Sequence, residues 1–404
     1  MTAIDSRGER STQGPLLLTM VALAFMGQMI LNPVIAPLSR AMGLQEWHVG
    51  ATISCAAVAL MLASPFWGRR AQRVGVRRVL VVAMALALCA LVAFAAVAWV
   101  GTLGLVAGPA LIIGMLLTRG VIYGGAIAAV TPTAQVHLVA HSATESDRVK
   151  AIGALGAMQG LASILGSVLG GVLAALGGLM FPVTVMPVVM LAGIVLLLAR
   201  FRPQPIESLI PEPRRVSFAD RRVLPFLVAG FTLFLGLSAA TSVLGFAVQD
   251  RFGIGDGGQV AGITAALQFT MSMVMMLTQG GLVRRLDWGP RRLLRVGFLV
   301  ALGGAVSVAL HAGLGVMFAG CALMGFGLGL AMPGYTAGPT GAVADDEQGG
   351  LAGVINATNG LTFAIGPVLF TALYGVDADM PFLGIAALFG LGAMFAFVHP
   401  RLRG

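Results

Sequence analysis

The feature that most constrains this chain is a series of twelve long apolar runs. A helix needs roughly 20 consecutive apolar residues to cross the hydrocarbon core of a bilayer. These runs are continuous instead of alternating with polar residues, which predicts helices and not the strands of a membrane barrel. They cover approximately residues 15–38, 48–67, 79–100, 104–131, 151–175, 177–199, 225–248, 258–283, 293–311, 313–338, 351–375 and 380–398. The sequence therefore predicts an all-α integral membrane protein with twelve transmembrane helices.

The composition agrees with a lipid-embedded chain. Only 10% of the 404 residues are charged and 58% are hydrophobic, whereas a soluble domain carries about 25% charge. The 56 glycines lack a three-residue period, so they indicate close helix packing in a membrane. Cys55, Cys89 and Cys321 all fall inside apolar runs and are spaced too widely for a metal motif. We expect them to be buried in the packing, with no disulfide, metal or cofactor role.

The distribution of the basic residues predicts the orientation. Lysine and arginine gather in cytoplasmic loops of membrane proteins. If the N-terminus is cytoplasmic, 22 of the 25 basic residues lie on the inner side, only Arg40 and Arg251 lie outside, and Arg119 lies within a run. The inner set is Arg7 and Arg10, Arg69 to Arg78, Arg148 and Lys150, Arg200 to Arg222, Arg284 to Arg295, and Arg401 and Arg403. The net charge of +9 is thus a topology signal, and nucleic acid is not an expected partner.

The chain is expected to consist of two halves. A proline-rich, charged segment at 201–224 separates an N-terminal six-helix bundle (1–200) from a C-terminal six-helix bundle (225–404), and a shorter inner loop at 133–150 joins the fourth and fifth runs. Residues 151–169 and 351–369 are identical at seven of 19 positions. Two pseudo-symmetric halves of this kind are typical of transporters.

The segment between the second and third runs carries a motif. The motif residues are Gly68, Gln72, Arg73, Gly75, Arg77 and Arg78. They resemble the Gly-x-x-x-Asp-Arg-x-Gly-x-Arg-Arg pattern of the major facilitator superfamily, except that Gln72 replaces the acid. A partial copy follows the eighth run, at Gly281, Asp287, Gly289, Arg291 and Arg292. The resemblance implies a latch that favours one conformational state; the alternative is that the arginines only anchor the topology.

The fifth run resembles the motif of the drug:proton antiporter branch of that family, Gly-x8-Gly-x3-Gly-Pro-x2-Gly-Gly. The corresponding positions hold Gly153, Ala162, Gly166, Ser167, Gly170 and Gly171, and the eleventh run has Gly366-Pro367. Small residues allow close helix approach, and a Gly/Pro site can bend in a membrane. The resemblance favours multidrug or metabolite efflux, whereas the alternative interpretation is static helix packing.

Arg119 is the only charge well inside a run. A mid-membrane arginine costs about 2.5–3.5 kcal/mol on insertion scales, so it should face a polar cavity and have a partner. It loosely resembles the family's fourth-helix motif linked to proton transfer, which makes it a coupling candidate; a structural arginine bonded to carbonyls is the alternative. The other coupling candidate is Asp250, the acid nearest to a buried position. Glu46, His48 and His137 are further groups that could titrate.

The resemblance also implies which runs line a substrate cavity, namely the first, fourth, seventh and tenth, with help from the fifth, eighth and eleventh. Their polar side chains are Gln28, Asn32, Arg119, Tyr123, Gln159, Ser238, Thr241, Gln268, Tyr335, Asn356 and Asn359. Uncharged hydrogen-bonding groups beside methionine and phenylalanine suit an amphipathic organic solute. Because Arg119 is the only buried charge expected, an anionic solute is also compatible with this set. Each polar group has the alternative of bonding only a neighbouring helix.

We therefore expect a secondary active transporter of the bacterial inner membrane, monomeric, with both termini cytoplasmic and with membrane lipid as its surroundings. It would export a small amphipathic molecule, a drug or a secreted metabolite such as a siderophore, by alternating access in exchange for protons. The alternatives are an importer or facilitator of an organic acid or nutrient, and a non-transporting receptor or lipid-handling protein on the same scaffold. An enzyme is not expected. The only lysine, Lys150, does not belong to a phosphate-binding loop.

Overall fold

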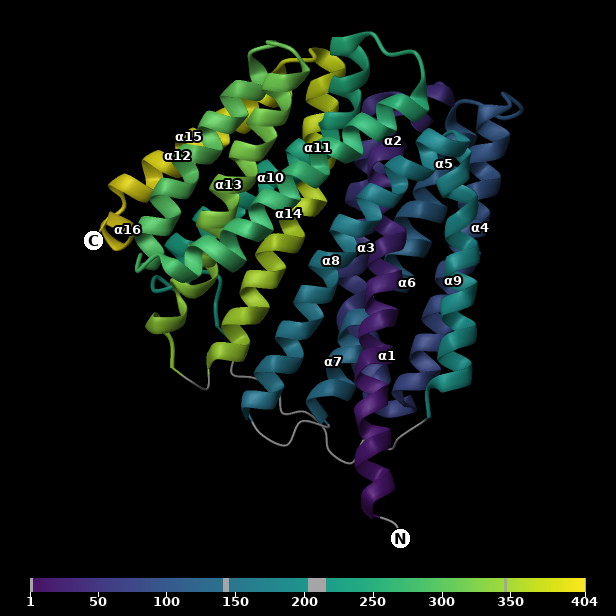
Figure 1. Cartoon of the computed structure of the whole chain (residues 1–404), viewed down its shortest axis with the longest axis vertical. Coiled ribbons are helices and arrows are strands. Elements are labelled where there is room, and N and C mark those ends of the chain that lie inside the picture. Colours follow the sequence, from purple (N-terminus) through teal and green to yellow (C-terminus); the bar gives the residue numbers. More distant parts are fainter. Residues whose placement is uncertain (1–2, 141–144, 203–215, 345–346, 404) are drawn as a thin grey trace. The chain divides into compact units, whose positions relative to one another are not determined.

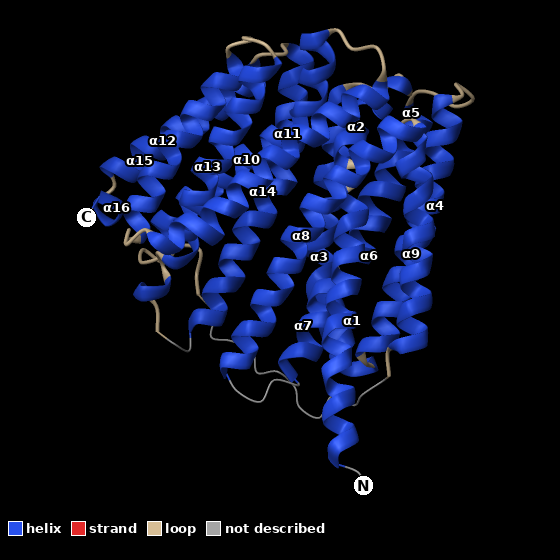
Figure 2. Ribbon diagram, viewed as in Figure 1, coloured by secondary structure: helices blue, strands red, loops and turns tan. Residues whose placement is uncertain are grey.

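The computed structural model describes residues 3–140, 145–202, 216–344 and 347–403, and every element in these ranges is helical (Figures 1 and 2). Twelve helical segments are long and apolar enough to cross a membrane, which confirms the predicted fold class. These spans are Gln13–Ala41, Glu46–Val74, Val76–Thr102, Pro109–Leu138, Gly153–Gly177, Met180–Arg200, Leu224–Phe252, Gly257–Arg285, Pro290–Ala309, Leu314–Ala342, Gln348–Val376 and Met380–Val398.

Several spans are built from more than one helical element. In chain order the elements are α1 (Ala3–Met29), α2 (Asn32–Ala41), α3 (Glu46–Val74), α4 (Val76–Thr102), α5 (Pro109–Met115), the π-helix η1 (Leu116–Ile122), α6 (Tyr123–Ile127), α7 (Val130–Ala140), α8 (Glu145–Gly177), α9 (Met180–Arg200), α10 (Leu224–Phe252), α11 (Gly257–Leu277), the π-helix η2 (Thr278–Leu282), the 3-10 turns η3 (Val283–Arg285) and η4 (Thr340–Ala342), α12 (Pro290–Ala309), α13 (Leu314–Ala337), α14 (Gln348–Val376), α15 (Met380–Val398) and α16 (Pro400–Arg403).

The chain forms two compact units. Unit 1 comprises Met1–Leu44, Cys55–Pro211 and Gly257–Gly262, and unit 2 comprises Gln45–Ser54, Glu212–Asp256 and Ile263–Gly404. Most of the expected linker, residues 203–215, lies outside the described residues. So do the side chains of five basic residues that were used for the orientation, Arg7, Arg10, Arg148, Lys150 and Arg403.

Two connections that we expected to be loops are largely helical. α3 continues to Val74 and α4 begins at Val76, so only Gly75 interrupts the helices within the 68–78 motif. Gly75 has φ +94°, which a residue without Cβ adopts readily. The expected loop at 133–150 likewise contains the end of α7 and, from Glu145, the start of α8. The predicted loops were too long because hydropathy marks only the lipid-embedded part of a helix. The backbone stays helical beyond that part.

Three spans are irregular where polar residues lie. The first span breaks between α1 and α2, at Ile30–Leu31, just before Asn32 and Pro33. The fourth span changes from α5 to the π-helix η1 around Arg119, and the eighth ends in the π-helix η2. π-helical turns occur frequently at functional sites. Irregular backbone in a membrane must also find other hydrogen-bond partners within the protein.

Glycines bring helix backbones into direct contact in unit 2. A Cβ placed on Gly304 of α12 would lie 2.5 Å from the backbone nitrogen of Met324 of α13, and one on Gly327 would lie 2.5 Å from the carbonyl oxygen of Gly297. Real Cβ atoms essentially never approach other atoms so closely. Glycine at these positions is therefore what lets α12 and α13 pack backbone to backbone, as small residues do between membrane helices.

The expectation for the cysteines is wrong at one position. Cys321 is buried and Cys55 partly buried, but Cys89 is exposed. Cys89 lies on α4 at helical spacing from Val82 and Leu86, which are 50% and 41% exposed. This face of α4 is apolar and unpacked within the chain, as a lipid-facing surface is, so an apolar run alone did not imply burial in the protein core.

Candidate functional site

Arg119 lies in the π-helix η1 and is only 6% exposed. Its Nη2 donates a hydrogen bond to the carbonyl oxygen of Gln28 at 3.2 Å, and its guanidinium carbon lies 5.0 Å from the centre of the Tyr123 ring. The Nε of Arg119 has no hydrogen-bond partner among the described residues. The carbonyl and the ring stabilise the cation in part, and one buried N–H remains available to a further acceptor.

Tyr123 fixes the position of this arginine. It is fully buried, and its hydroxyl donates to the carbonyl oxygen of Ala24 in α1 at 3.0 Å. A Cβ on Gly27 would lie 2.5 Å from the tyrosine hydroxyl. The missing side chain at Gly27 is therefore what allows Tyr123, and with it the π-helix, to approach α1.

α8 packs against the break in the first span. A Cβ on Gly170 would lie 2.0 Å from the carbonyl oxygen of Ile30, and a Cβ on Gly166 would lie 2.7 Å from the Cβ of Met29. Of the other positions in the predicted exporter motif, Ala162, Ser167 and Gly171 are buried, and Gly153 is exposed with open space around it. Two of the motif glycines thus bring α8 into contact with the backbone just before Asn32.

The remaining candidates of unit 1 bond to neighbouring groups. The Nε2 of Gln159 in α8 donates to the hydroxyl of Thr131 in α7 at 2.9 Å. The Nδ2 of Asn32 points to the sulfur of Met29 at 3.3 Å. Gln28 and Asn32 are both half-buried. The structure therefore brings Gln28, Arg119 and Tyr123 together, whereas Gln159 bonds to a different helix.

Unit 2 contains a second buried tyrosine with a similar setting. Tyr335 of α13 is fully buried. Its hydroxyl donates to Oδ1 of Asn359 in α14 at 3.1 Å and also reaches the carbonyl oxygen of Ile355 at 3.4 Å. A Cβ on Gly230 of α10 would lie 2.1 Å from the Tyr335 ring. The ring therefore occupies the space that a side chain on α10 would need.

A separate polar group joins α10 to α11. Gln268 is 4% exposed, and its Nε2 donates to the carbonyl oxygen of Thr241 at 3.4 Å while its Oε1 has no partner among the described residues. Ser238 is 1% exposed, and its hydroxyl likewise has no such partner. Gly366 packs over this serine, since a Cβ there would lie 2.8 Å from the serine Oγ. These unpaired buried groups mark where a further polar group would be stabilised.

The structure does not bury two residues that we expected to be important. Asn356 is exposed on α14. Asp250 is exposed near the end of α10, and its Oδ2 accepts a hydrogen bond from the hydroxyl of Tyr374 at 2.8 Å. The position of Asp250 at the last turns of α10 explains its exposure, because that end of the helix reaches the edge of the apolar span.

The other groups that could titrate are held in local contacts. His48 is 9% exposed, and its Nδ1 accepts the backbone N–H of Gln45 at 3.0 Å. His137 is 4% exposed and its ring lies 5.5 Å from that of Phe201. Glu46 forms the first turn of α3. Within the described ranges no three His, Cys, Asp or Glu side chains are grouped to hold a metal ion.

The arginine motif between α3 and α4 is tied to the end of α9. The Nη2 of Arg77 donates to the carbonyl oxygen of Leu198 at 2.9 Å. Gln72 is half-buried, whereas Arg73 and Arg78 are exposed. Gly68 packs towards α7, where a Cβ would lie 3.6 Å from the ring of Pro132. In unit 2, Pro367 lies inside α14 and cannot donate a backbone hydrogen bond there.

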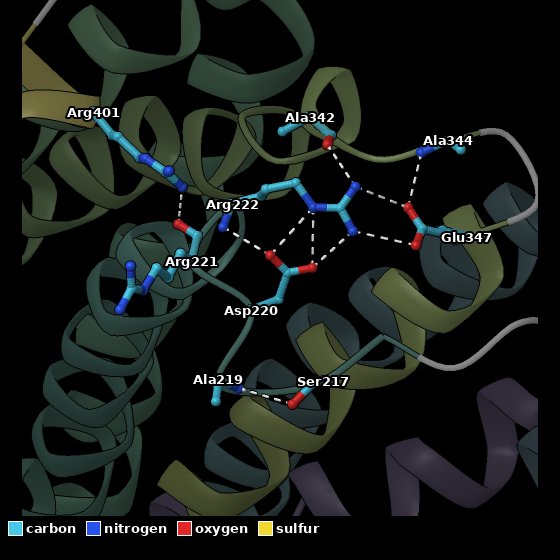
Figure 3. Close-up of polar contacts among 9 residues, drawn as sticks. All are labelled: Ser217, Ala219, Asp220, Arg221, Arg222, Ala342, Ala344, Glu347 and Arg401. Atoms are coloured by element: carbon cyan, nitrogen blue, oxygen red, sulfur yellow. Dashed lines mark hydrogen bonds and ion pairs between the residues drawn. The ribbon is translucent and has the colours of Figure 1, made fainter.

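A charged clasp at one edge of unit 2 was not anticipated from the sequence (Figure 3). Arg222 bonds the carboxylate of Asp220, with Nη2 to Oδ2 at 2.8 Å, and reaches Glu347 with Nη1 to Oε2 at 3.1 Å. The hydrogen bonds and charge of Arg222 lower the pKa of Asp220 below its ordinary value. The two carboxylates raise the pKa of Arg222, which stays protonated. The clasp joins the segment before α10 to the start of α14.

Sequence reasoning found the buried cation but missed the positions that shape its surroundings. Gly27 and Gly230, which accommodate the two buried tyrosines, and Thr131, the partner of Gln159, were not singled out. Helical spacing offers a partial signal for Gly27, because Ala24, Gly27 and Gln28 lie on one face of α1. Contacts between helices distant in sequence leave no comparable signal.

Comparisons with known proteins place this architecture in context. Residues 17–367 match the family model described as the Major Facilitator Superfamily. Multidrug resistance protein 2 of Bacillus subtilis (strain 168) is 24% identical over 401 residues, covering 96% of this chain and 95% of that protein. The class G tetracycline resistance protein of Vibrio anguillarum is 29% identical over 384 residues, covering 89% and 90%, and the class C protein of Escherichia coli is 26% identical over 376 residues, covering 88% and 87%.

Solved structures agree on the fold. A bacterial homologue of the human lysosomal transporter Spinster, in an inward-facing, occupied conformation, superposes with a TM-score of 0.76 at 14% identity and covers 96% of both chains. The same kind of protein in an inward-facing, unoccupied conformation gives a TM-score of 0.77 at 14% identity, covering 98% of this chain and 97% of that one.

Proposed function

This chain belongs to the major facilitator superfamily and is a multi-pass membrane transporter, not an enzyme; we propose that it exports a small amphipathic organic molecule by alternating access in exchange for protons. The substrate class we propose is a drug-like compound or a secreted metabolite, a siderophore among them. We propose that it is a monomer of the bacterial inner membrane. We place both termini in the cytoplasm, because the basic residues fall almost entirely on one side of the predicted spans.

The observation that carries the proposal is the buried guanidinium of Arg119. Its charge has a carbonyl and a ring beside it, its Nε lacks a partner, and no described acid pairs with it. A buried cation without a counter-charge is costly. An anionic or strongly polar substrate group at Arg119 would relieve that cost. The same relief would come from a group that exchanges a proton there, which links the residue to coupling.

The other polar side chains support an amphipathic substrate. Ser238 and Gln268 each have one buried oxygen without a partner among the described residues, on helices that are mainly apolar. Few polar groups set in an apolar surround are typical of small-molecule sites. In unit 1 we propose Arg119 as a group that contacts substrate, with Tyr123 positioning the helix that carries it. In unit 2 we propose Ser238 and Gln268, with Tyr335 packed on the helix that carries Ser238.

The direction rests on the relatives. Proteins named for multidrug and tetracycline resistance match nearly the full length of this chain. The glycines of the expected exporter motif, Gly166 and Gly170, also lie at the break in the first span. Their close contact couples α8 to any bending of that break. These two points together favour export over import.

Transport into everted membrane vesicles tests the proposal. With tetracycline added to the outside and an interior-acid proton gradient imposed, the wild-type vesicles should accumulate the compound, and a protonophore should abolish the accumulation. Arg119→Gln should lose it at normal expression, whereas Arg200→Gln, which removes an exposed arginine at the end of α9, should retain it. Normal accumulation by Arg119→Gln would remove Arg119 from the mechanism.

An importer or facilitator of an organic acid is the second candidate, favoured by the same unpaired cation. It predicts the opposite gradient dependence. Right-side-out vesicles would then take up a carboxylate such as lactate or citrate in an Arg119-dependent way, and everted vesicles would show no proton-driven accumulation of amphipathic cations or of tetracycline. That pair of results would replace export with import.

A further inference from the structure

A strongly basic cavity lies at one edge of unit 2. Its volume is about 730 Å³, which is within the range of small-molecule sites, about 300–1,000 Å³. Five of its lining residues are arginines and, within the described part of the lining, none is acidic. The lining residues are Arg222, Phe226, Gly289, Pro290, Arg291, Arg292, Arg295, Gly338, Gly341, Ala342 and Arg401.

Arg222, one of the five arginines, has a structural role in the lining of the cavity. Arg222 is neutralised by Asp220 and Glu347 and also donates through Nη1 to the carbonyl oxygen of Ala342 at 3.3 Å (Figure 3). It therefore holds the 3-10 turn η4 beside the start of α10. The positive charge of the cavity comes mainly from the other four arginines.

Local contacts orient three of those four. The guanidinium of Arg292 lies 4.3 Å from the Trp288 ring centre, and that of Arg295 lies 5.5 Å from the Phe397 ring centre. Arg401 donates to the carbonyl oxygen of Arg221 (Figure 3). Each guanidinium has five N–H donors, so the ring stacking of Arg292 and the single backbone bond of Arg401 leave donors for a ligand. Stacked arginines are also less mobile, which lowers the entropy lost on binding.

The start of α12 adds to the positive potential. Gly289, Pro290, Arg291 and Arg292 form the first turn of this 20-residue helix and line the cavity. The N-terminus of a helix carries partial positive charge and favours anions. Four arginines and a helix N-terminus around one cavity repel each other, and an anion with several oxygens would relieve that repulsion.

We propose that this cavity binds a phosphate-bearing anion. Phosphate offers the oxygens that guanidinium groups bind bidentately, and the volume leaves room for a group attached to it. Two sources carry this chemistry, the headgroup of an anionic phospholipid and a soluble phosphate ester. The phospholipid has an additional feature in its favour, because Phe397, stacked with Arg295, is 42% exposed and offers apolar surface next to the cavity.

Binding to the purified full-length protein in a neutral detergent tests the site. The probes are dioctanoyl phosphatidylglycerol, dioctanoyl phosphatidylcholine and glycerol 3-phosphate, followed by calorimetry. Saturable binding of phosphatidylglycerol is expected, with Arg291→Gln/Arg292→Gln at least about tenfold weaker, since one charge-assisted hydrogen bond contributes about that factor. Arg284→Gln/Arg285→Gln is the matched control, because it removes the same charge from the same connection outside the cavity and should bind as wild type.

A second variant keeps every arginine. A Cβ on Gly341 meets no atom within 4 Å, so Gly341→Leu would fill part of the cavity without loss of charge, and it too should weaken binding about tenfold or more. Binding of phosphatidylglycerol but not of glycerol 3-phosphate supports the site with a lipid as its ligand, and equal binding of both supports it with a soluble phosphate ester.

Three results would overturn the proposal. These are no saturable binding of either anion, equal loss in the cavity pair and the control pair, and equal binding of phosphatidylcholine. Size-exclusion profiles of the variants show whether each is folded, and Gly341→Leu remains a test if the double arginine variant is not. The readout is binding, so its failure leaves the export proposal untouched.

Discussion

The contact between α8 and the broken first span gives the sharpest test of the fold. Gly170→Ala would place a Cβ 2.0 Å from the carbonyl oxygen of Ile30 and 2.8 Å from its carbonyl carbon. To restore even a separation of 3.0 Å, the two backbones must move apart by about 1 Å, the difference between those distances. Backbone atoms cannot swing away as a side-chain end can. Overpacking of this kind costs about 1–3 kcal/mol.

A matched control isolates the steric term. Gly160→Ala is the same substitution on the same helix, and a Cβ there meets no atom within 4 Å. Both variants gain the helix propensity of alanine over glycine, about 1 kcal/mol, so that gain cancels in the comparison. Gly170→Ala should therefore be less stable than Gly160→Ala by about 1–3 kcal/mol.

Thermal unfolding of the purified variants in detergent, followed by the loss of the monodisperse peak, measures this difference. At about 2–4 °C per kcal/mol for a unit of roughly 200 residues, Gly170→Ala should melt about 2–12 °C below Gly160→Ala. Equal melting temperatures would mean that α8 and Ile30 are not in backbone contact, and the account of the glycine motif would be wrong.

Three further outcomes follow from single contacts. Tyr123→Phe removes the hydrogen bond to Ala24 and should lower the free energy of unfolding by about 0.5–1.5 kcal/mol, measured by the same melting assay. Gly230→Ala should destabilise by about 1–3 kcal/mol because its Cβ would lie 2.1 Å from the Tyr335 ring, and adding Tyr335→Ala should cost less than the sum of the two changes. The hydrogen bond with His311 and the charge of Arg251 hold the pKa of Asp379 below its ordinary value. The ionised carboxylate therefore stabilises the fold above about pH 4, and this contribution is lost as the pH falls below that value; melting of Asp379→Asn should fall less steeply than that of wild type between about pH 5 and pH 3.

The sequence was a good guide wherever one physical requirement acted alone. The cost of exposing backbone to lipid makes each span a long, mainly helical apolar segment, so all twelve were predictable. The cost of burying charge made Arg119 conspicuous, and it is buried. Span ends were less predictable, since α3 stays helical to Val74, beyond its apolar part. Asp250 is exposed at the end of α10 and bonds Tyr374, and its role as a coupling group stays a prediction.

The surroundings of the candidate site could not be predicted, for a different reason. The π-helical turn around Arg119 and the approach of Tyr123 to Gly27 depend on how two distant helices pack. Glycine is so frequent in this chain that its type alone does not distinguish Gly27 from an open position such as Gly160. Only the three-dimensional contacts show at which glycines a neighbouring helix or side chain leaves no room for a Cβ.

The two units share a packing arrangement, but the hydrogen bonds of the tyrosines in it differ. In each, a buried tyrosine packs on a glycine of a neighbouring helix, Tyr123 on Gly27 and Tyr335 on Gly230. Both hydroxyls bond a backbone carbonyl, that of Ala24 for Tyr123 and that of Ile355 for Tyr335, but the hydroxyl of Tyr335 also bonds the side chain of Asn359. A backbone carbonyl of a helix cannot turn without unwinding it, but an amide side chain can rotate. Among the described residues, the hydroxyl of Tyr123 bonds only a backbone carbonyl, and the buried cation stacks on this tyrosine. We therefore expect substrate-dependent rearrangement to be larger at Asn359, whose side chain can rotate, than at Arg119.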